Sequence, residues 1–309
     1  MRSLAGGLAL LLLPVAAPAA PAAECERGWT FPVPFFQSVA WSPDGSRLAF
    51  AAVTESWEEG YALFLVDRDG TNLRRLPTGP ALYPVFSPDG SRLAYMSRGE
   101  NRDLHLLDLA TGEISRLTHH PASDGYPSFS PDGSQIVFHS DRDGDYEIYV
   151  MDLAAGSTPR RLTDHPADDY NPVWSPAGGQ IVFESDRDEV EGDEIYLVDA
   201  DGTALRQVGV GVFPTWSPDG SRLLVAADGL EWRAVDGSGG GRLLEDAVYG
   251  AWSPDGRSVA AAAVELDEEC VDHHSLVLLD ARDGARLGRL YPGPAAPGGG
   301  EPPPPAERR

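Results

Sequence analysis

The chain of 309 residues is 42% hydrophobic, which is enough to bury one or two sizeable cores. Asp and Glu together number 48 against 24 Arg and no Lys, so the formal net charge at pH 7 is −24. Nucleic acids and acidic lipid head groups need cationic contacts, and this charge excludes both as partners. Cations, basic proteins and neutral ligands remain candidate partners.

Residues 1–23 have the layout of a secretory signal peptide. Arg2 precedes an apolar run that begins at Leu4, and small residues follow, with an Ala-Pro-Ala cleavage signal at 20–22. The run is too short to span a membrane comfortably, and no later segment is apolar for long enough to do so. We expect a soluble mature protein without a membrane span, secreted to the periplasm or the extracellular space.

A short motif recurs six times between residues 38 and 291. The copies are WSPDG at 41, FSPDG at 86 and 129, WSPAG at 174, and WSPDG at 216 and 252, with starts 45, 43, 45, 42 and 36 residues apart. A repeat of this length with short β-type segments is typical of propeller blades. The sequence therefore predicts an all-β fold, a six-bladed β-propeller of four-stranded antiparallel blades, over residues 38–291.

Each copy contains the parts of a four-stranded meander. A short inner strand ends in the aromatic residue of the motif, and Ser-Pro-Asp-Gly then makes a tight turn in which Pro presets φ and Gly accepts positive φ. A second strand, a variable loop and a third strand follow. The third strand is expected to end at an Asp that precedes a second tight turn and a short fourth strand. These residues are Asp67, Asp108, Asp152, Asp199, Asp236 and Asp280.

Two segments flank the repeats. Residues 24–37 form a lead-in that we expect to pack on the propeller, and the Pro- and Gly-rich residues 292–309 are predicted to be a disordered tail. Cys25 heads the lead-in, and Cys270 lies between the second and third strands of the sixth copy. In an oxidising compartment a disulfide between Cys25 and Cys270 would tie the N-terminus to the last blade, and two unpaired thiols are the alternative.

The strings WSPDGSRLAF, FSPDGSQIVFHSDRDGDYEIYVMD and PRRLTDHP resemble the WD-like repeat of the TolB-like six-bladed propeller family. The resemblance covers about 254 of the 309 residues. Family members include TolB, which binds partner proteins of the outer envelope, and the regulatory propellers of prolyl-oligopeptidase-like peptidases. TolB has an additional α/β domain ahead of its propeller, which we do not expect here, because about 14 residues separate the predicted cleavage site from the first repeat. The nucleophile motif G-x-S-x-G of the peptidases does not occur in this chain.

The strand order assigns the loops to two faces. Both kinds of tight turn lie on one face, which we call the tight-turn face, and the loops between second and third strands lie with the blade-to-blade connections on the other, the variable-loop face. Six segments of the variable-loop face hold 20 of the 48 acidic residues. These segments are 54–60, 119–125, 140–145, 164–170, 185–193 and 265–274. Binding residues usually lie on such loops, so this acidic face is the predicted contact for a protein or peptide, with basic partners favoured by charge.

Aromatic residues occur at two positions of the inner strands. Those that open the turn motif recur in every copy, and we expect them to pack as core between neighbouring blades. A second set stands near the start of the inner strands, where it is expected to open onto the mouth of the central channel, with acidic residues beside it. The predicted binding residues are Tyr83, Asp124, Tyr126, Asp168, Asp169, Tyr170, Phe213 and Tyr249.

A calcium site is one interpretation of the D-R-D-G-D string. Asp141, Asp143 and Asp145 alternate as oxygen ligands do in calcium loops, and the alternative is a hairpin loop in which Asp and Gly serve the turn. Calcium is the one cofactor that this pattern would permit, and no other is predicted.

The sequence therefore predicts a monomeric binding scaffold without enzymatic activity. The alternative is a propeller hydrolase or lyase with a divalent metal at the central channel. That alternative would need inward-pointing His, Asp or Glu side chains from several inner strands.

Overall fold

The computed structural model describes residues 36–53, 60–99, 101–154, 156–187, 194–266 and 272–292, without the side chains of 36–37, 264–266, 272–274 and 291–292. All of these residues belong to one compact unit, Phe31–Arg309. The predicted signal peptide, the lead-in up to residue 35, Cys25, Cys270 and the tail beyond Pro292 lie outside the described residues.

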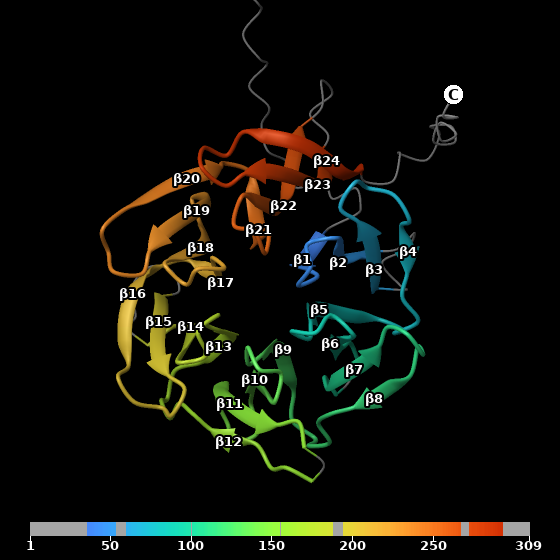
Figure 1. The fold of residues 1–309 in the computed structure, drawn as a ribbon. Coiled ribbons are helices and arrows are strands. Elements are labelled where there is room, and N and C mark those ends of the chain that lie inside the picture. Colours follow the sequence, from blue (N-terminus) through green and yellow to red (C-terminus); the bar gives the residue numbers. More distant parts are fainter. Residues whose placement is uncertain are drawn as a thin grey trace, which may run out of the picture. The chain divides into compact units, whose positions relative to one another are not determined.

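Six antiparallel sheets, each of four consecutive strands, make up the described part of the chain. Figure 1 shows them arranged around a common centre, from blade 1 in blue to blade 6 in red. This confirms the all-β, six-bladed prediction. Within the described ranges no α-helix forms, and so none there is long and apolar enough to cross a membrane.

The first strand of each blade lies nearest the centre (Figure 1). Each of these inner strands ends in the aromatic residue of the repeated turn motif. The inner strands are β1 (Phe36–Trp41), β5 (Ala81–Phe86), β9 (Asp124–Phe129), β13 (Asp169–Trp174), β17 (Val212–Trp216) and β21 (Ala247–Trp252).

The second and third strands form the buried middle of each blade. The second strands are β2 (Arg47–Val53), β6 (Arg92–Ser97), β10 (Gln135–Ser140), β14 (Gln180–Ser185), β18 (Arg222–Ala227) and β22 (Ser258–Leu266). The third strands are β3 (Tyr61–Asp67), β7 (Leu104–Asp108), β11 (Glu147–Asp152), β15 (Glu194–Asp199), β19 (Gly229–Ala234) and β23 (Asp272–Asp280). Five of the six third strands end at the predicted Asp. The prediction is wrong for the fifth, because β19 ends at Ala234 and Asp236 lies beyond it.

The fourth strands lie at the rim (Figure 1) and differ in length. Those of the first three blades have only two or three residues, which leaves little free edge for pairing with another chain. The fourth strands are β4 (Arg74–Arg75), β8 (Ile114–Arg116), β12 (Arg160–Arg161), β16 (Arg206–Val210), β20 (Gly240–Leu244) and β24 (Arg286–Pro292).

The Ser-Pro-Asp-Gly turn owes its recurrence to a local hydrogen-bond network. In blade 1 the Ser42 hydroxyl donates to Asp44 Oδ1 at 2.6 Å, and the Ser46 N–H donates to the same oxygen at 3.0 Å. Gly45 has a φ of 68°, which a residue without Cβ adopts at no steric cost. The hydrogen bond from Ser42 and those from Ser46 lower the pKa of Asp44 to about 2. Each motif that retains its Asp therefore folds its own turn, independently of the other blades.

The aromatic residues of the turn motif are buried between blades, as predicted. Trp41 of blade 1 is 8% exposed, and its indole N–H donates to the carbonyl of Ala251 in blade 6 at 3.1 Å. Trp41 belongs to a hydrophobic core cluster that also contains Leu48 of blade 1 and Leu276 of blade 6. Because no described strand is shared between the first and last blades, this packing is what joins them.

Candidate functional site

One position near the start of the inner strand has an unusual backbone conformation in five of the six blades. It is the third residue of β1, β5, β9 and β13 and the second residue of β17. Its φ lies between 53° and 69° at Ser38, Tyr83, Tyr126, Asn171 and Phe213. The strand ladder also shifts register at this point, which marks a β-bulge. In four of these blades a Pro follows and withholds its backbone donor from the ladder. The bulge turns the side chain at this position out of the regular alternation of the strand.

The side chains at this position meet across blades. The rings of Tyr83 and Tyr126 stack with centroids 3.6 Å apart, and those of Phe213 and Tyr249 lie 4.3 Å apart at 38°. The Tyr126 hydroxyl donates to the hydroxyl oxygen of Tyr83, which is also hydrogen-bonded to Tyr249. Blades 2 and 6 are not neighbours, so the contact between Tyr83 and Tyr249 crosses the centre of the ring. We call Tyr83, Tyr126, Asn171, Phe213 and Tyr249 the axial cluster.

A buried carboxylate supports the axial cluster from blade 4. Glu184 of β14 is 1% exposed, and its Oε1 accepts a hydrogen bond from Asn171 Nδ2 at 2.7 Å and another from the Phe213 N–H. Burial raises the pKa of Tyr126 and Tyr249 far above the ordinary value, and the charge of Glu184 raises them further. The tyrosine hydroxyls therefore stay protonated at neutral pH and can recognise a ligand through hydrogen bonds.

A neutral histidine lies beside the same cluster. His139 of β10 packs against Tyr126 and Tyr146, with ring centroids 5.0 and 4.9 Å away. Burial lowers the pKa of His139 to about 3, and the positive charge of Arg102 acts in the same direction. Its Nδ1 lies 3.4 Å from the Asn171 N–H and accepts a weak hydrogen bond from it. His139 is therefore an uncharged acceptor at neutral pH.

The structure brings together four of the five aromatic residues that the sequence singled out, namely Tyr83, Tyr126, Phe213 and Tyr249. Tyr170 lies one residue before the cluster position, which Asn171 occupies in blade 4. The following Pro gives the correct register, since Tyr83, Tyr126, Asn171 and Phe213 each precede one. The aromatic residue alone therefore misplaces the position by one residue in blade 4.

Asp124 and Asp169 lie at the starts of their inner strands, but both are fully buried in ion pairs. Arg142 Nη2 lies 2.8 Å from Asp124 Oδ1, and Arg187 Nη2 lies 2.7 Å from Asp169 Oδ1. Both guanidinium groups also lie over two aromatic rings of their own blade. These two carboxylates are thus engaged in holding the loop after the second strand.

Asp168 and two of the predicted calcium residues, Asp141 and Asp143, accept hydrogen bonds from other segments of the chain. Asp168 Oδ1 accepts from the Tyr146 N–H at 2.8 Å, and Asp141 Oδ1 accepts from the Ser123 N–H at 2.8 Å. Asp143 accepts from the Tyr149 hydroxyl, and Asp145 is exposed. Among the described residues, no three His, Cys, Asp or Glu side chains are grouped so that they could hold a metal ion. The acidic segments 54–59, 188–193 and 267–271 lie outside the described residues.

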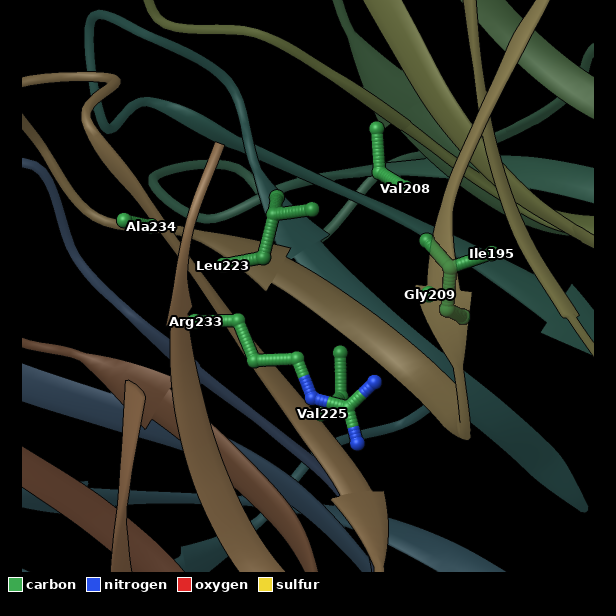
Figure 2. Close-up of a pocket in the computed structure, with 7 residues that line it drawn as sticks. All are labelled: Ile195, Val208, Gly209, Leu223, Val225, Arg233 and Ala234. Atoms are coloured by element: carbon green, nitrogen blue, oxygen red, sulfur yellow. The ribbon is translucent and has the colours of Figure 1, made fainter. Parts of the chain in front are cut away.

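Two hollows lie between blades 4 and 5, away from the axial cluster. Figure 2 shows the residues that line the smaller one. Its volume is about 10 Å³, which has room for one water molecule at most. An open groove of about 640 Å³ follows β16 past Gln207 and Arg233. Neither contains a residue that the sequence singled out for binding.

The fold and the axial cluster define a β-propeller with a polar aromatic centre. Comparison with known proteins identifies the family to which this propeller belongs. A family model described as the TolB beta propeller domain matches residues 46–233. This match covers more than half of the chain, and the protein belongs to that family.

Curated relatives match a shorter stretch. The Tol-Pal system protein TolB of Coxiella burnetii is 36% identical over 86 residues, or 26% of this chain and 20% of the relative. TolB of Thioalkalivibrio sulfidiphilus is 38% identical over 76 residues, or 23% of this chain and 18% of the relative. The matched stretch therefore spans about a fifth of these proteins.

Solved structures show the same fold over most of the chain. TolB from Acinetobacter baumannii superposes with a TM-score of 0.65 at 24% identity, over 81% of this chain and 62% of that one. An oligogalacturonate lyase in complex with manganese superposes with a TM-score of 0.57 at 18% identity, over 81% of this chain and 76% of that one. At these identities the likeness shows the fold alone.

Proposed function

We propose that this protein is an exported, monomeric scaffold of the cell envelope that binds a protein or peptide at the variable-loop face, over the axial cluster, and catalyses no reaction. The observation that carries the proposal is the meeting of aromatic side chains from four blades at the centre of the ring. Tyrosines and other aromatic residues contribute most to protein interfaces, because one side chain offers a large rigid surface and a polar tip.

Charge and relatives support the same proposal. The segments around the variable-loop face hold many of the acidic residues, which favours a basic partner and a fast encounter with it. Relatives named as Tol-Pal system proteins support a periplasmic place and a protein partner. The metal-dependent lyase or hydrolase stays a prediction from the sequence, since the likeness to oligogalacturonate lyase concerns the fold.

Capture of a partner from the native envelope fraction tests the proposal. Tagged mature protein is the bait, beside a double variant that carries Phe213→Ala and Tyr249→Ala. The matched control carries Leu205→Ala and Leu287→Ala, which remove two exposed apolar side chains, 45% and 54% exposed, away from the axial cluster.

We expect the wild type and the control to retain the same protein and the axial variant to lose it. Replacing Glu55, Glu58 and Glu59 by Gln, or raising the salt concentration, should weaken the capture through the loss of charge attraction. Equal capture by the axial variant and the control, or no specific capture by the wild type, would show the proposal to be wrong.

A further inference from the structure

Glu194 at the start of β15 is a buried carboxylate without a partner. It is 1% exposed, and neither of its side-chain oxygens has a hydrogen bond among the described residues. An ionised carboxylate that is buried without donors loses its hydration and gains nothing in return. Such a group is a candidate binding site for a cation that the chain does not itself supply.

The equivalent carboxylate in blade 3 has hydrogen-bond donors that Glu194 lacks. Glu147 at the start of β11 is fully buried and accepts hydrogen bonds from Arg161 Nη2, from the Thr163 hydroxyl and from the His165 N–H at 2.7 Å. In blade 2 the corresponding Asp103 pairs with Arg116 at 2.9 Å. The two acids are therefore held by an arginine of the fourth strand.

Blade 4 has lost that arginine. In blades 2 and 3 the strand ladders place this arginine opposite the third-strand residue two positions after the acid. Blades 1, 5 and 6 have an Arg at the same ladder position although Ala62, Gly229 and Ser275 stand where the acid would be. The five arginines are Arg75, Arg116, Arg161, Arg242 and Arg289. In blade 4 the ladder places Gln207 there, opposite Tyr196, and it places Val210, which has no hydroxyl, opposite Glu194. Both side-chain donors that hold Glu147 are thus missing around Glu194.

Two described arginines of blades 4 and 5, Arg187 and Arg233, are bound to other partners. Arg187 donates to both carboxylate oxygens of Asp169 at 2.7 Å. Arg233 donates to the Val210 carbonyl and lies on the side of the sheet where Ile195 lines the small cavity in Figure 2. Side chains alternate along a strand, so Glu194 points to the opposite side, towards blade 3. Residues 188–193, which precede Glu194, contain four carboxylates and no Lys, Arg or His.

We propose that Glu194 binds a guanidinium group supplied by another molecule, an arginine side chain of a partner polypeptide that takes the place held by Arg161 in blade 3. Guanidinium suits the position because its planar N–H groups can satisfy both carboxylate oxygens at once. The surrounding acidic sequence favours the approach of such a side chain. The identification of a polypeptide as its source rests on the proposed function.

Three substitutions test the premise without any ligand. Glu147→Gln should lower the thermal midpoint, because it leaves Arg161 without its charged partner. Glu194→Gln should not lower it, because it removes an unpaired charge. Gln207→Arg should raise it, because the chain then supplies its own guanidinium group. If Glu194→Gln lowers the midpoint as much as Glu147→Gln does, or if Gln207→Arg has no stabilising effect, the premise is wrong.

Calorimetry with the mature protein tests the ligand. The probe is the peptide N-acetyl-Gly-Arg-Gly amide at millimolar concentration, and its control replaces Arg by citrulline, a neutral side chain of nearly the same shape. We expect binding of the arginine peptide to wild type, and binding weaker by about tenfold or more to Glu194→Gln and to Gln207→Arg.

Equal heats from the two peptides, or no heat from the arginine peptide, would overturn the proposal, and so would calcium chloride binding at Glu194 in its place. The outcome is separate from the envelope capture. A partner lost from the Phe213→Ala and Tyr249→Ala variant but retained by Glu194→Gln supports the proposed function and contradicts this site. Arginine binding at Glu194 without any envelope partner would do the reverse.

Discussion

Replacing His139 by Gln is expected to flatten the pH dependence of the free energy of unfolding. The folded chain holds the imidazole neutral, with a pKa of about 3 against an ordinary value of 6.5. Tyr126, Tyr146 and Asn171 surround the ring, and the nearby charge is that of Arg102. The unfolded chain binds a proton below pH 6.5 and the folded chain does not, so stability is complete above pH 6.5 and is lost as the pH falls towards 3.

The size of the effect follows from the two pKa values. Each pH unit inside the window is worth at most about 1.4 kcal/mol, so His139 alone removes roughly 2 kcal/mol between pH 6.5 and 4.5. The turn carboxylates Asp44, Asp89, Asp132 and Asp219 have pKa values of about 2, lowered from 3.8, so they lose their stabilising effect mainly below pH 4. The interval from 4.5 to 6.5 therefore isolates the histidine from them.

Urea unfolding at five pH values between 4.5 and 6.5 measures the effect. We expect the wild type to lose roughly 2 kcal/mol more than His139→Gln across this interval. His119→Gln, which removes an exposed imidazole, is the matched control. Parallel pH profiles of the wild type and His139→Gln would refute the assignment of a buried neutral imidazole.

Two further predictions concern the ion pairs and turns. Arg187→Ala leaves the carboxylate of the fully buried Asp169 without the hydrogen bonds from Arg187, and we expect the free energy of unfolding in urea to fall by about 3–5 kcal/mol. The control, Arg206→Ala, removes an exposed side chain and should lower it by less than about 0.5 kcal/mol. A fall below about 1 kcal/mol for Arg187→Ala would contradict the role of the pair. Ala177→Asp restores the turn acceptor that the fourth motif lacks, and differential scanning calorimetry at pH 7 should show a midpoint higher by about 1–2 °C. By analogy with Asp132, that gain should vanish as the pH falls through about 2, and a gain that persists there would have another cause.

The sequence predicts the fold well because the residues that shape each blade's turn lie next to one another in the sequence. Ser42 and Asp44 make their turn from neighbouring residues, and equivalent contacts recur in the other blades that retain the Asp. The aromatic residue before the turn is buried wherever it occurs. Local geometry and repetition are both visible in a single chain. The predicted end of β19 is wrong because Asp236 resembles, in type and spacing, the Asp that ends the other third strands, whereas β19 ends at Ala234.

The candidate site is less visible because it is assembled from residues that interact between blades. Glu184 and His139 lie in second strands, and their local sequence does not predict that Glu184 contacts Asn171 or that His139 packs against Tyr126. Asp124 and Asp169 open the inner strands, and from the sequence alone this place predicts side chains that face a ligand. The matching Ser-Asp-Arg strings at 140 and 185 contain the arginines that pair with these two carboxylates. In the sequence both strings read only as parts of a variable loop. The missing arginine at Gln207 is recognised only once the ladders align the blades.

The most direct test of the account is photo-crosslinking in the native envelope fraction, with benzoylphenylalanine placed at Tyr249 in one protein and at Leu205 in another. Tyr249 belongs to the axial cluster, whereas Leu205 is an exposed residue that precedes β16 on the tight-turn face. We predict a covalent adduct with one partner protein from position 249 and none from position 205. An adduct from position 205 alone, or equal adducts from both, would contradict a partner site at the centre of the propeller.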